Sequence, residues 1–412
     1  MVKIRAFPGL RPRPELAEMI ASPPYDVLSS EEARRLAAAN DKSFLHVNKP
    51  EIDLAATIDP YSTTVYEKGR DNLRRFIDEQ WLVQDVTPSI YLYRLTWRGH
   101  QQTGFFCLSS VDDYDAGRIK KHELTRAKKE KDRSDLIDTM NAQVGPVFLL
   151  YKANERLNTL LKGHSTHPAP VDFTTTDGVQ HELWVIDAEA DITAIEQGFA
   201  ELPATYVADG HHRSASASNV CRARRAANPS YTGEEPFNYF LSVIFPDDQL
   251  QILPYNRVIR DLNGLEPEEF LARVRTAFTL ETFPGEVIVE QPHTFAMYLG
   301  GVWYRLLPLP DSWDAQDVLE NLDVNILVSN LLEPVLGIGD PRTDPRIDFV
   351  GGIRGNQELE QLVDTGKFAV AFALYPTSVE LLIGVADAGE IMPPKSTWFE
   401  PKLRSGMVCH LL

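Results

Sequence analysis

The sequence predicts an α+β fold in which mixed sheets are combined with helices. Two stretches, 89–111 and 294–309, each hold two runs of β-branched and aromatic residues about a Gly-containing turn, the pattern of a β-hairpin. Two other stretches, 64–83 and 266–278, are expected to be helices, since apolar and polar residues alternate there at helical spacing. Because strands and helices do not alternate regularly, we expect a mixed arrangement rather than a series of βαβ units.

The remaining elements are predicted from caps and short apolar runs. Ser29 or Ser30 can cap a helix whose first turn carries Glu31 and Glu32, where negative charge is favourable. Further helices are expected at 192–202, 214–227 and 323–332, strands at 183–187, 205–209, 239–245 and 250–259, and a strand–helix–strand group at the end of the chain.

Three regions are expected along the 412 residues, with no repeat and no low-complexity linker between them. Residues 1–150 carry "PPYDV" and a basic tract, residues 151–262 carry "DGHHR", and residues 263–412 carry "MPPKST". We expect all three to contribute to one cleft.

Composition excludes several classes of protein. Three cysteines, Cys107, Cys221 and Cys409, lie far apart without CxxC spacing, which argues against a disulfide framework or a zinc knuckle. The N-terminal stretch has no apolar signal region, and no apolar run approaches the roughly 18 residues that span a bilayer. We therefore expect a cytoplasmic protein with no membrane partner.

The net charge of −18 argues against a nucleic-acid partner, since an acidic chain repels a phosphate backbone. Positive charge is nevertheless concentrated in one tract, 118–133. Its sixteen residues include eight Lys or Arg and three Asp or Glu, which leaves five net positive charges. In an acidic protein, such a tract can attract a small anion.

The segment from Asp209 to Arg213 is the first candidate site. Gly210 permits a tight turn after an apolar strand, and a helix is expected to begin near His212. The amides at a helix start bind anions, and the planar guanidinium of Arg213 suits phosphate. His211 can donate a hydrogen bond or move a proton. Asp209 could cap the helix, act as a base, or hold a magnesium ion.

Two other interpretations of this segment remain open. Asp209 could be only an N-cap, with His211 and His212 bonded into the core, although each buried polar group needs a partner. A transition-metal site is the other interpretation, but the usual HxH, HExxH and HxxxH spacings are absent. We therefore favour an anion-binding turn.

The basic tract is the second candidate site. It could instead be a solvated helix held by ion pairs of Glu123 with Arg126, Arg126 with Glu130, and Glu130 with Arg133. Its candidate site residues are His122, Glu123, Thr125, Lys128, Lys129, Asp132 and Arg133.

Two proline-rich turns and one strand residue supply the remaining candidates. Pro23–Pro24 can present Tyr25 and Asp26. "MPPKSTWFEPKL" places Lys395 after a proline pair and Lys402 after Pro401, on a rigid turn that suits phosphate. Arg257 would project a cation from a strand. A Walker A loop and a GxGxxG turn are both absent, so a nucleotide would have to be held in another way.

Four segments together carry a family resemblance: "FPGLRP…PPYDV", "KHELT…KEKDR", "ADGHHRSASA" and "MPPKSTWFEPKL". On them the chain is identified as a member of a widespread bacterial and archaeal family of unknown function (domain-of-unknown-function family ten-fifteen). The "DGHHR" segment is similar to the phosphate-binding signature of free-serine kinases (SerK), which belong to the ParB/sulfiredoxin-like superfamily.

The resemblance implies a ParB/sulfiredoxin-like core around this loop and helix. It implies that the phosphate groups are contacted by Asp209, His211, His212 and Arg213. It also implies phosphoryl transfer to free L-serine from ATP, ADP or pyrophosphate. Glu123, from the HE pair of the family, is the expected base on the acceptor hydroxyl. Lys128 or Lys129 would stabilise charge in the transition state, and magnesium would bridge donor oxygens.

Three other functions use the same residues. A non-catalytic sensor would bind a nucleotide or phosphometabolite without turnover. A phosphohydrolase would release phosphate without an acceptor. A DNA-binding protein would bind DNA in a salt-sensitive way, which the overall charge disfavours.

Overall fold

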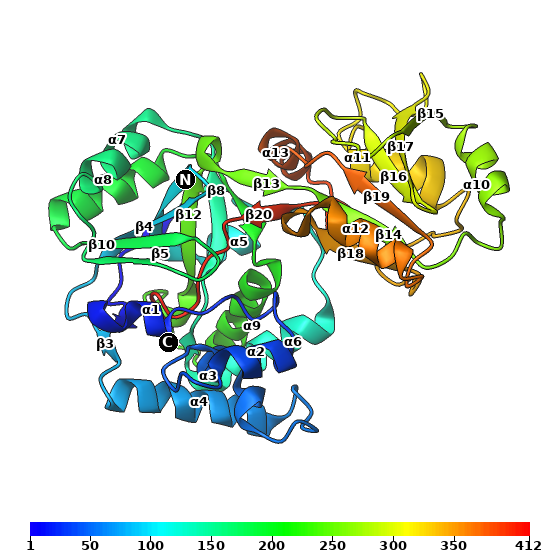
Figure 1. Cartoon of the computed structure of the whole chain (residues 1–412). Helices are drawn as coiled ribbons and strands as arrows, with labels where there is room; N and C mark the ends of the chain where they lie inside the picture. Colours follow the sequence, from blue (N-terminus) through cyan, green and yellow to red (C-terminus); the bar gives the residue numbers. More distant parts are fainter. The chain divides into compact units, whose positions relative to one another are not determined.

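The computed structural model describes all residues, 1–412. The chain forms two compact units (Figure 1). Unit 1 comprises residues 1–121, 125–250 and 401–412, and unit 2 comprises residues 122–124 and 251–400.

Unit 1 is built on a mixed sheet of nine strands. The strand order is β6 (Ile119–Lys120), β11 (Thr205–Asp209), β8 (Val147–Tyr151), β12 (Tyr239–Pro246), β5 (His100–Ser110), β4 (Ile90–Trp97), β10 (Gln180–Ile186) and β9 (Val171–Thr174), and β1 (Ile4–Arg5) pairs with β5. β12 is buried along its whole length, as its mostly apolar sequence predicts. β4 and β5 form the hairpin expected at 89–111.

Helices of unit 1 belong to two hydrophobic cores. The first joins the sheet to α5 (Val111–Asp115), α7 (Glu155–His164), α8 (Glu189–Ala200) and α9 (His211–Ala227). The second contains residues of α1 (Ala17–Ile20), α3 (Leu45–Asn48), α4 (Thr63–Asp78) and α6 (Ala127–Met140). α2 (Ser30–Ala37) packs with α3 in a smaller cluster.

Two short ladders complete unit 1. β2 (Leu10–Pro12) pairs with β3 (Leu82–Gln84), and β7 (Ala142–Gln143) pairs with β21 (His410–Leu411) at the end of the chain. The second ladder fixes the C-terminal segment 401–412 beside elements from the first half of the chain.

Unit 2 is built on an antiparallel sheet of six strands. The order is β15 (Phe278–Phe283), β17 (Val302–Pro308), β16 (Phe295–Leu299), β19 (Val370–Leu374), β14 (Tyr255–Ile259) and β18 (Ile347–Gly351). Its helices are α10 (Pro267–Val274), α11 (Asp323–Leu327), α12 (Gly355–Asp364) and α13 (Val379–Ala388). β13 (Gln251–Leu253) and β20 (Trp398–Glu400) form a separate pair.

The mixed α+β class predicted from the sequence is confirmed. Ser29 caps α2 in a capping box with Glu32, as its position before two glutamates predicts. The helix expected at 323–332 divides, because a π-helical turn, Val328–Leu332, follows α11. Strands from residues 1–150 and from 151–250 lie in the same sheet, because β8, β11 and β12 pair across that expected boundary.

Candidate functional site

The turn between β11 and α9 is the centre of the candidate site. β11 ends at Asp209, Gly210 has φ of 95°, and α9 begins at His211. Such a backbone conformation is one that glycine adopts without the steric cost of a Cβ atom. No side chain caps α9, so its first turn presents backbone amides at the positive end of the helix dipole.

Asp209 is held through both carboxylate oxygens. Gly210 N donates to Oδ1 at 2.7 Å, and Lys402 Nζ lies 2.7 Å from Oδ2. Burial alone would raise the pKa of Asp209, but the charge and hydrogen bond of Lys402, with the charge of Arg213, hold that pKa well below its usual range. A carboxylate kept ionised in this way is a weak proton acceptor at neutral pH, which argues against Asp209 as the base.

The two histidines differ in environment. His211 is buried, with 6% of its surface exposed. His212 is half-buried, and its Nε2 accepts a hydrogen bond of 3.0 Å from Arg126 N, so the neutral ring carries its proton on Nδ1. Burial and the charge of Lys129 lower the pKa of His212. The ring is therefore neutral at neutral pH and acts as a hydrogen-bond donor rather than as a cation.

Arg213 is fixed by the chain around it. Its Nη1 donates to Pro146 O at 2.7 Å, and its guanidinium lies 5.4 Å from the centroid of the Tyr25 ring. A Cβ atom at Gly145 would lie 2.9 Å from Arg213 Cζ, so the glycine makes room for the guanidinium. Arg133 lies 4.1 Å from the same Tyr25 ring, so two cations share one aromatic side chain.

A pocket in unit 1 opens between these groups. Its cavity volume is about 30 Å³, so it is a narrow recess between these side chains. Tyr25, Arg133 and Arg213 line it with Asn48, Leu136, Ile137, Met140, Gln143, Val144, Gly145, Val147, Phe240 and Leu241. Its wall is mostly apolar, and its charged groups are the two arginines. Burial and the charge of Asp26 raise the pKa of Tyr25 to about 12, so the phenol stays neutral.

The basic tract lies against α9, but not as the helix that the sequence suggested. α6 begins at Ala127, so Glu123 and Arg126 precede it and cannot form the expected helical pair. Arg133 pairs with its neighbour Asp132 at 2.6 Å, not with Glu130. Ser216 Oγ donates to Glu130 O at 2.9 Å, which joins α9 to α6.

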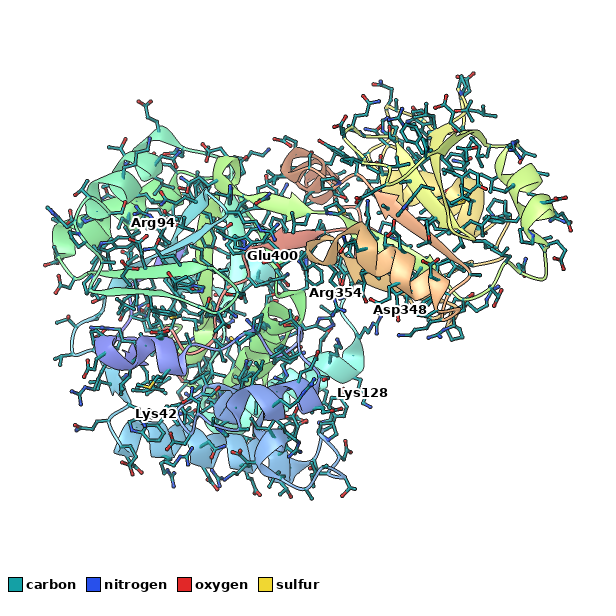
Figure 2. The ribbon with its side chains drawn as sticks, viewed as in Figure 1. Lys42, Arg94, Lys128, Asp348, Arg354 and Glu400 are labelled. Atoms are coloured by element: carbon teal, nitrogen blue, oxygen red, sulfur yellow. The ribbon has the colours of Figure 1, made fainter.

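Other candidates of this tract also have partners that do not line the pocket. Asp132 is buried and accepts from Tyr66 Oη at 3.0 Å, and Thr125 donates to the Glu130 carboxylate. Lys128 lies in the first turn of α6, where its exposed side chain (Figure 2) stacks on Tyr61 at 4.2 Å from the ring centroid. Arg133 is therefore the member of the tract that lines the pocket with Arg213.

Four candidates belong to unit 2, so their role in this site remains a prediction. His122 is buried and its backbone oxygen accepts from Met392 N at 2.8 Å; Glu123 is half-buried. Lys395 is exposed at φ of 60°. Arg257 is not the projecting cation that was expected. It is 3% exposed, burial lowers its pKa to about 10, and it donates to the backbone oxygens of Tyr255 and Lys395.

Two residues of this site lie in the proline-rich turns that the sequence singled out, although neither of them had a specific predicted role. Lys402 follows Pro401 in the segment that also carries Lys395, and it reaches Asp209. Tyr25 and Asp26 both follow the rigid Pro23–Pro24 turn, but Tyr25 lines the pocket whereas the side chain of Asp26 is exposed.

Magnesium fits Asp209 poorly. Its oxygens already accept from an amide and from the ammonium of Lys402, whose positive charge disfavours a second cation. We therefore derive no step through a metal held by this residue.

Comparison with known proteins identifies the family. Residues 4–325 match the family described as "Protein of unknown function (DUF1015)". The chain belongs to this family. No curated protein matches it. No helix is both long and apolar enough to cross a bilayer.

Several solved structures are similar to this DUF1015 member at low sequence identity. A free serine kinase variant in complex with AMP is 13% identical over 71% of this chain and 86% of that chain, with a TM-score of 0.36. A conserved hypothetical protein from Pyrococcus furiosus is 12% identical over 73% and 93%, with a TM-score of 0.33. SbnI with C-terminal truncation from Staphylococcus aureus is 15% identical over 71% and 81%, with a TM-score of 0.36.

Proposed function

We propose that this protein binds the phosphate groups of a nucleotide at the turn from Gly210 to Arg213. The observation that carries the proposal is the start of α9: its first turn has no side-chain cap, follows a left-handed glycine, and carries the guanidinium of Arg213. Amides at a helix start and a planar cation together form an anion site. The resemblance of this segment to free-serine kinases extends the proposal to a ParB/sulfiredoxin-like core around β11 and α9.

The proposed reaction is phosphoryl transfer from ATP, ADP or pyrophosphate to free L-serine, giving O-phospho-L-serine. The serine oxygen forms a bond to phosphorus, the bond to the leaving phosphate oxygen breaks, and the hydroxyl proton passes to a base. Glu123 is the proposed base, since Asp209 is already held by Lys402. Such a transfer depends mainly on positioning and on positive groups around the phosphoryl.

Each residue of the turn has a proposed part in this reaction. The α9 amides hold donor oxygens, Arg213 stabilises the charge that develops on the phosphoryl, and neutral His212 donates from Nδ1. Lys128 and Lys129, at the start of α6, add positive potential near the donor.

The experiment incubates purified protein with L-serine and each donor in turn, and measures phosphoserine. Arg213→Met should reduce turnover about tenfold or more, as expected for loss of a charged hydrogen-bond donor. Arg222→Met is the matched control, because Arg222 is an exposed arginine farther along the same helix, bonded to Asn219. Absence of phosphoserine with every donor, from folded protein, would refute the serine kinase.

The engagement of Asp209 by Lys402 favours a second candidate, a nucleotide sensor without turnover. In that case calorimetry would show saturable binding of ADP or ATP while no phosphoserine forms. Release of inorganic phosphate without serine would instead indicate a phosphohydrolase.

A further inference from the structure

The C-terminal segment brings a lysine to the proposed phosphate site from the far end of the chain. Segment 401–412 belongs to unit 1 and is held on several sides by backbone hydrogen bonds. Ser405 exchanges bonds of 2.9 and 3.1 Å with Ser22, and Cys409 exchanges bonds of 2.7 and 2.9 Å with Leu10. Lys402 therefore reaches Asp209 from a backbone whose course is fixed.

We propose that Lys402 is the positioning residue of the anion-binding turn, acting through the carboxylate of Asp209. This inference rests on the proposed function. It adds a residue beyond the part of the chain that the family match covers, 4–325.

The geometry gives Lys402 two effects on the turn. Its Nζ lies 2.7 Å from Asp209 Oδ2, while Gly210 N donates to Oδ1 at the same distance. With both oxygens engaged, the carboxylate is fixed in one orientation, and it holds the left-handed turn that aims the α9 amides. The side chain of Lys402 is 17% exposed and that of Asp209 is 39% exposed, so solvent screens this contact from the side of the carboxylate.

The second effect is on charge. Asp209 places a negative charge directly before a site proposed to bind an anion, and an unneutralised carboxylate there would repel phosphate. The charged or titratable groups that act on Asp209 are Lys402, then Arg213 and His211 of α9. From β8, Asp209 faces the apolar Phe148 in the strand register. Lys402 is therefore the main counter-charge, and it leaves Arg213 available for the ligand.

The test measures ADP binding by calorimetry with the full-length chain. Lys402→Met should weaken binding about ten- to a hundredfold, the range for removing a charged hydrogen-bond partner. Asp209→Asn in the same variant removes the stranded charge and should recover most of that loss. Lys402→Arg, which keeps the charge, should bind within a few-fold of the unmodified protein. Lys42→Met is the control, because Lys42 also pairs with a carboxylate, that of Asp41 at 3.5 Å, and lies outside the basic tract.

The pH dependence gives a readout that a purely structural lysine would not change. Without Lys402, Asp209 loses the group that most lowers its pKa, so the carboxylate takes up a proton at a higher pH than in the unmodified protein. Affinity of Lys402→Met relative to the unmodified protein should therefore improve from pH 7.5 towards pH 5.

The outcomes separate this inference from the proposed function. If the unmodified protein does not bind ADP, both fail. If it binds ADP and Lys402→Met binds equally well, or if Asp209→Asn brings no recovery, the positioning role is refuted while the nucleotide site stands. Should Lys402→Met not fold, Lys402→Gln, which keeps a hydrogen bond but no charge, decides in the same way: weaker binding supports the role, and unchanged binding overturns it.

Discussion

Gly210 offers the sharpest test of the anion-binding turn, through its substitution by alanine. The backbone at this position has φ of 95°. A side chain at such a φ costs roughly 1–2 kcal/mol. A Cβ atom would also lie 3.4 Å from Val147 Cα, an ordinary to tight contact with backbone that cannot move away easily. We therefore expect Gly210→Ala to lower the free energy of unfolding by about 1–2 kcal/mol.

The functional effect should be larger than the loss of stability suggests. If the turn relaxes to relieve the strain, the amides of the first turn of α9 no longer point at a common site. Affinity for ADP should then fall by about tenfold or more, the effect of losing one to two hydrogen bonds to a charged group. Denaturant unfolding gives the first quantity, and calorimetry with ADP gives the second.

Gly178 supplies the matched control. It has φ of 78° in the turn between β9 and β10, and a Cβ atom there would meet nothing within 4 Å. Gly178→Ala should therefore cost about the same 1–2 kcal/mol of stability. Its affinity for ADP should stay unchanged. If Gly210→Ala bound ADP as well as Gly178→Ala does, the helix start would not be the phosphate site.

The remaining predictions concern Gly145 and His181. Gly145→Ala would place a Cβ atom 2.9 Å from Arg213 Cζ, so it should displace the guanidinium and weaken ADP binding severalfold. Gly163→Ala, on α7 with nothing within 4 Å, should leave ADP binding unchanged and stabilise the protein by about 0.5–1 kcal/mol. Equal affinities of these two variants would contradict the place given to Arg213. Burial and the charge of Arg404 lower the pKa of His181 to about 3. As the pH falls, His181 therefore takes up a proton in the unfolded state at a higher pH than in the folded state. The free energy of unfolding should decrease by roughly 2 kcal/mol between pH 6.5 and pH 5. Urea unfolding at both pH values measures the decrease, and His181→Gln should reduce it; an unchanged pH dependence would show that His181 is not responsible.

Much of the local structure was predictable because the signals are close in sequence. The strand before Asp209, the turn at Gly210 and the helix after it follow from an apolar run, a glycine and a tract of small residues. The capping box at Ser29 and the hairpin of β4 and β5 have equally local causes. The alternative interpretation of the basic tract offered three helical ion pairs. The pair of Glu123 with Arg126 does not form within a helix because α6 begins only at Ala127, and Arg133 pairs with Asp132 rather than with Glu130.

The sequence by itself determined the α+β class, the family signatures and the residue types of an anion-binding turn, because those depend on neighbouring residues and on total charge. Only the tertiary structure decided which distant groups reach that turn. Lys402 is 193 positions from Asp209, and Arg213 and Arg133 meet at Tyr25 from three separate parts of the chain. Such contacts depend on how strands pair and where the end of the chain returns, and no local spacing encodes either. Arg257 was expected to project as a cation, but its side chain is buried and donates to backbone oxygens. The reason is that its strand, β14, lies inside a sheet.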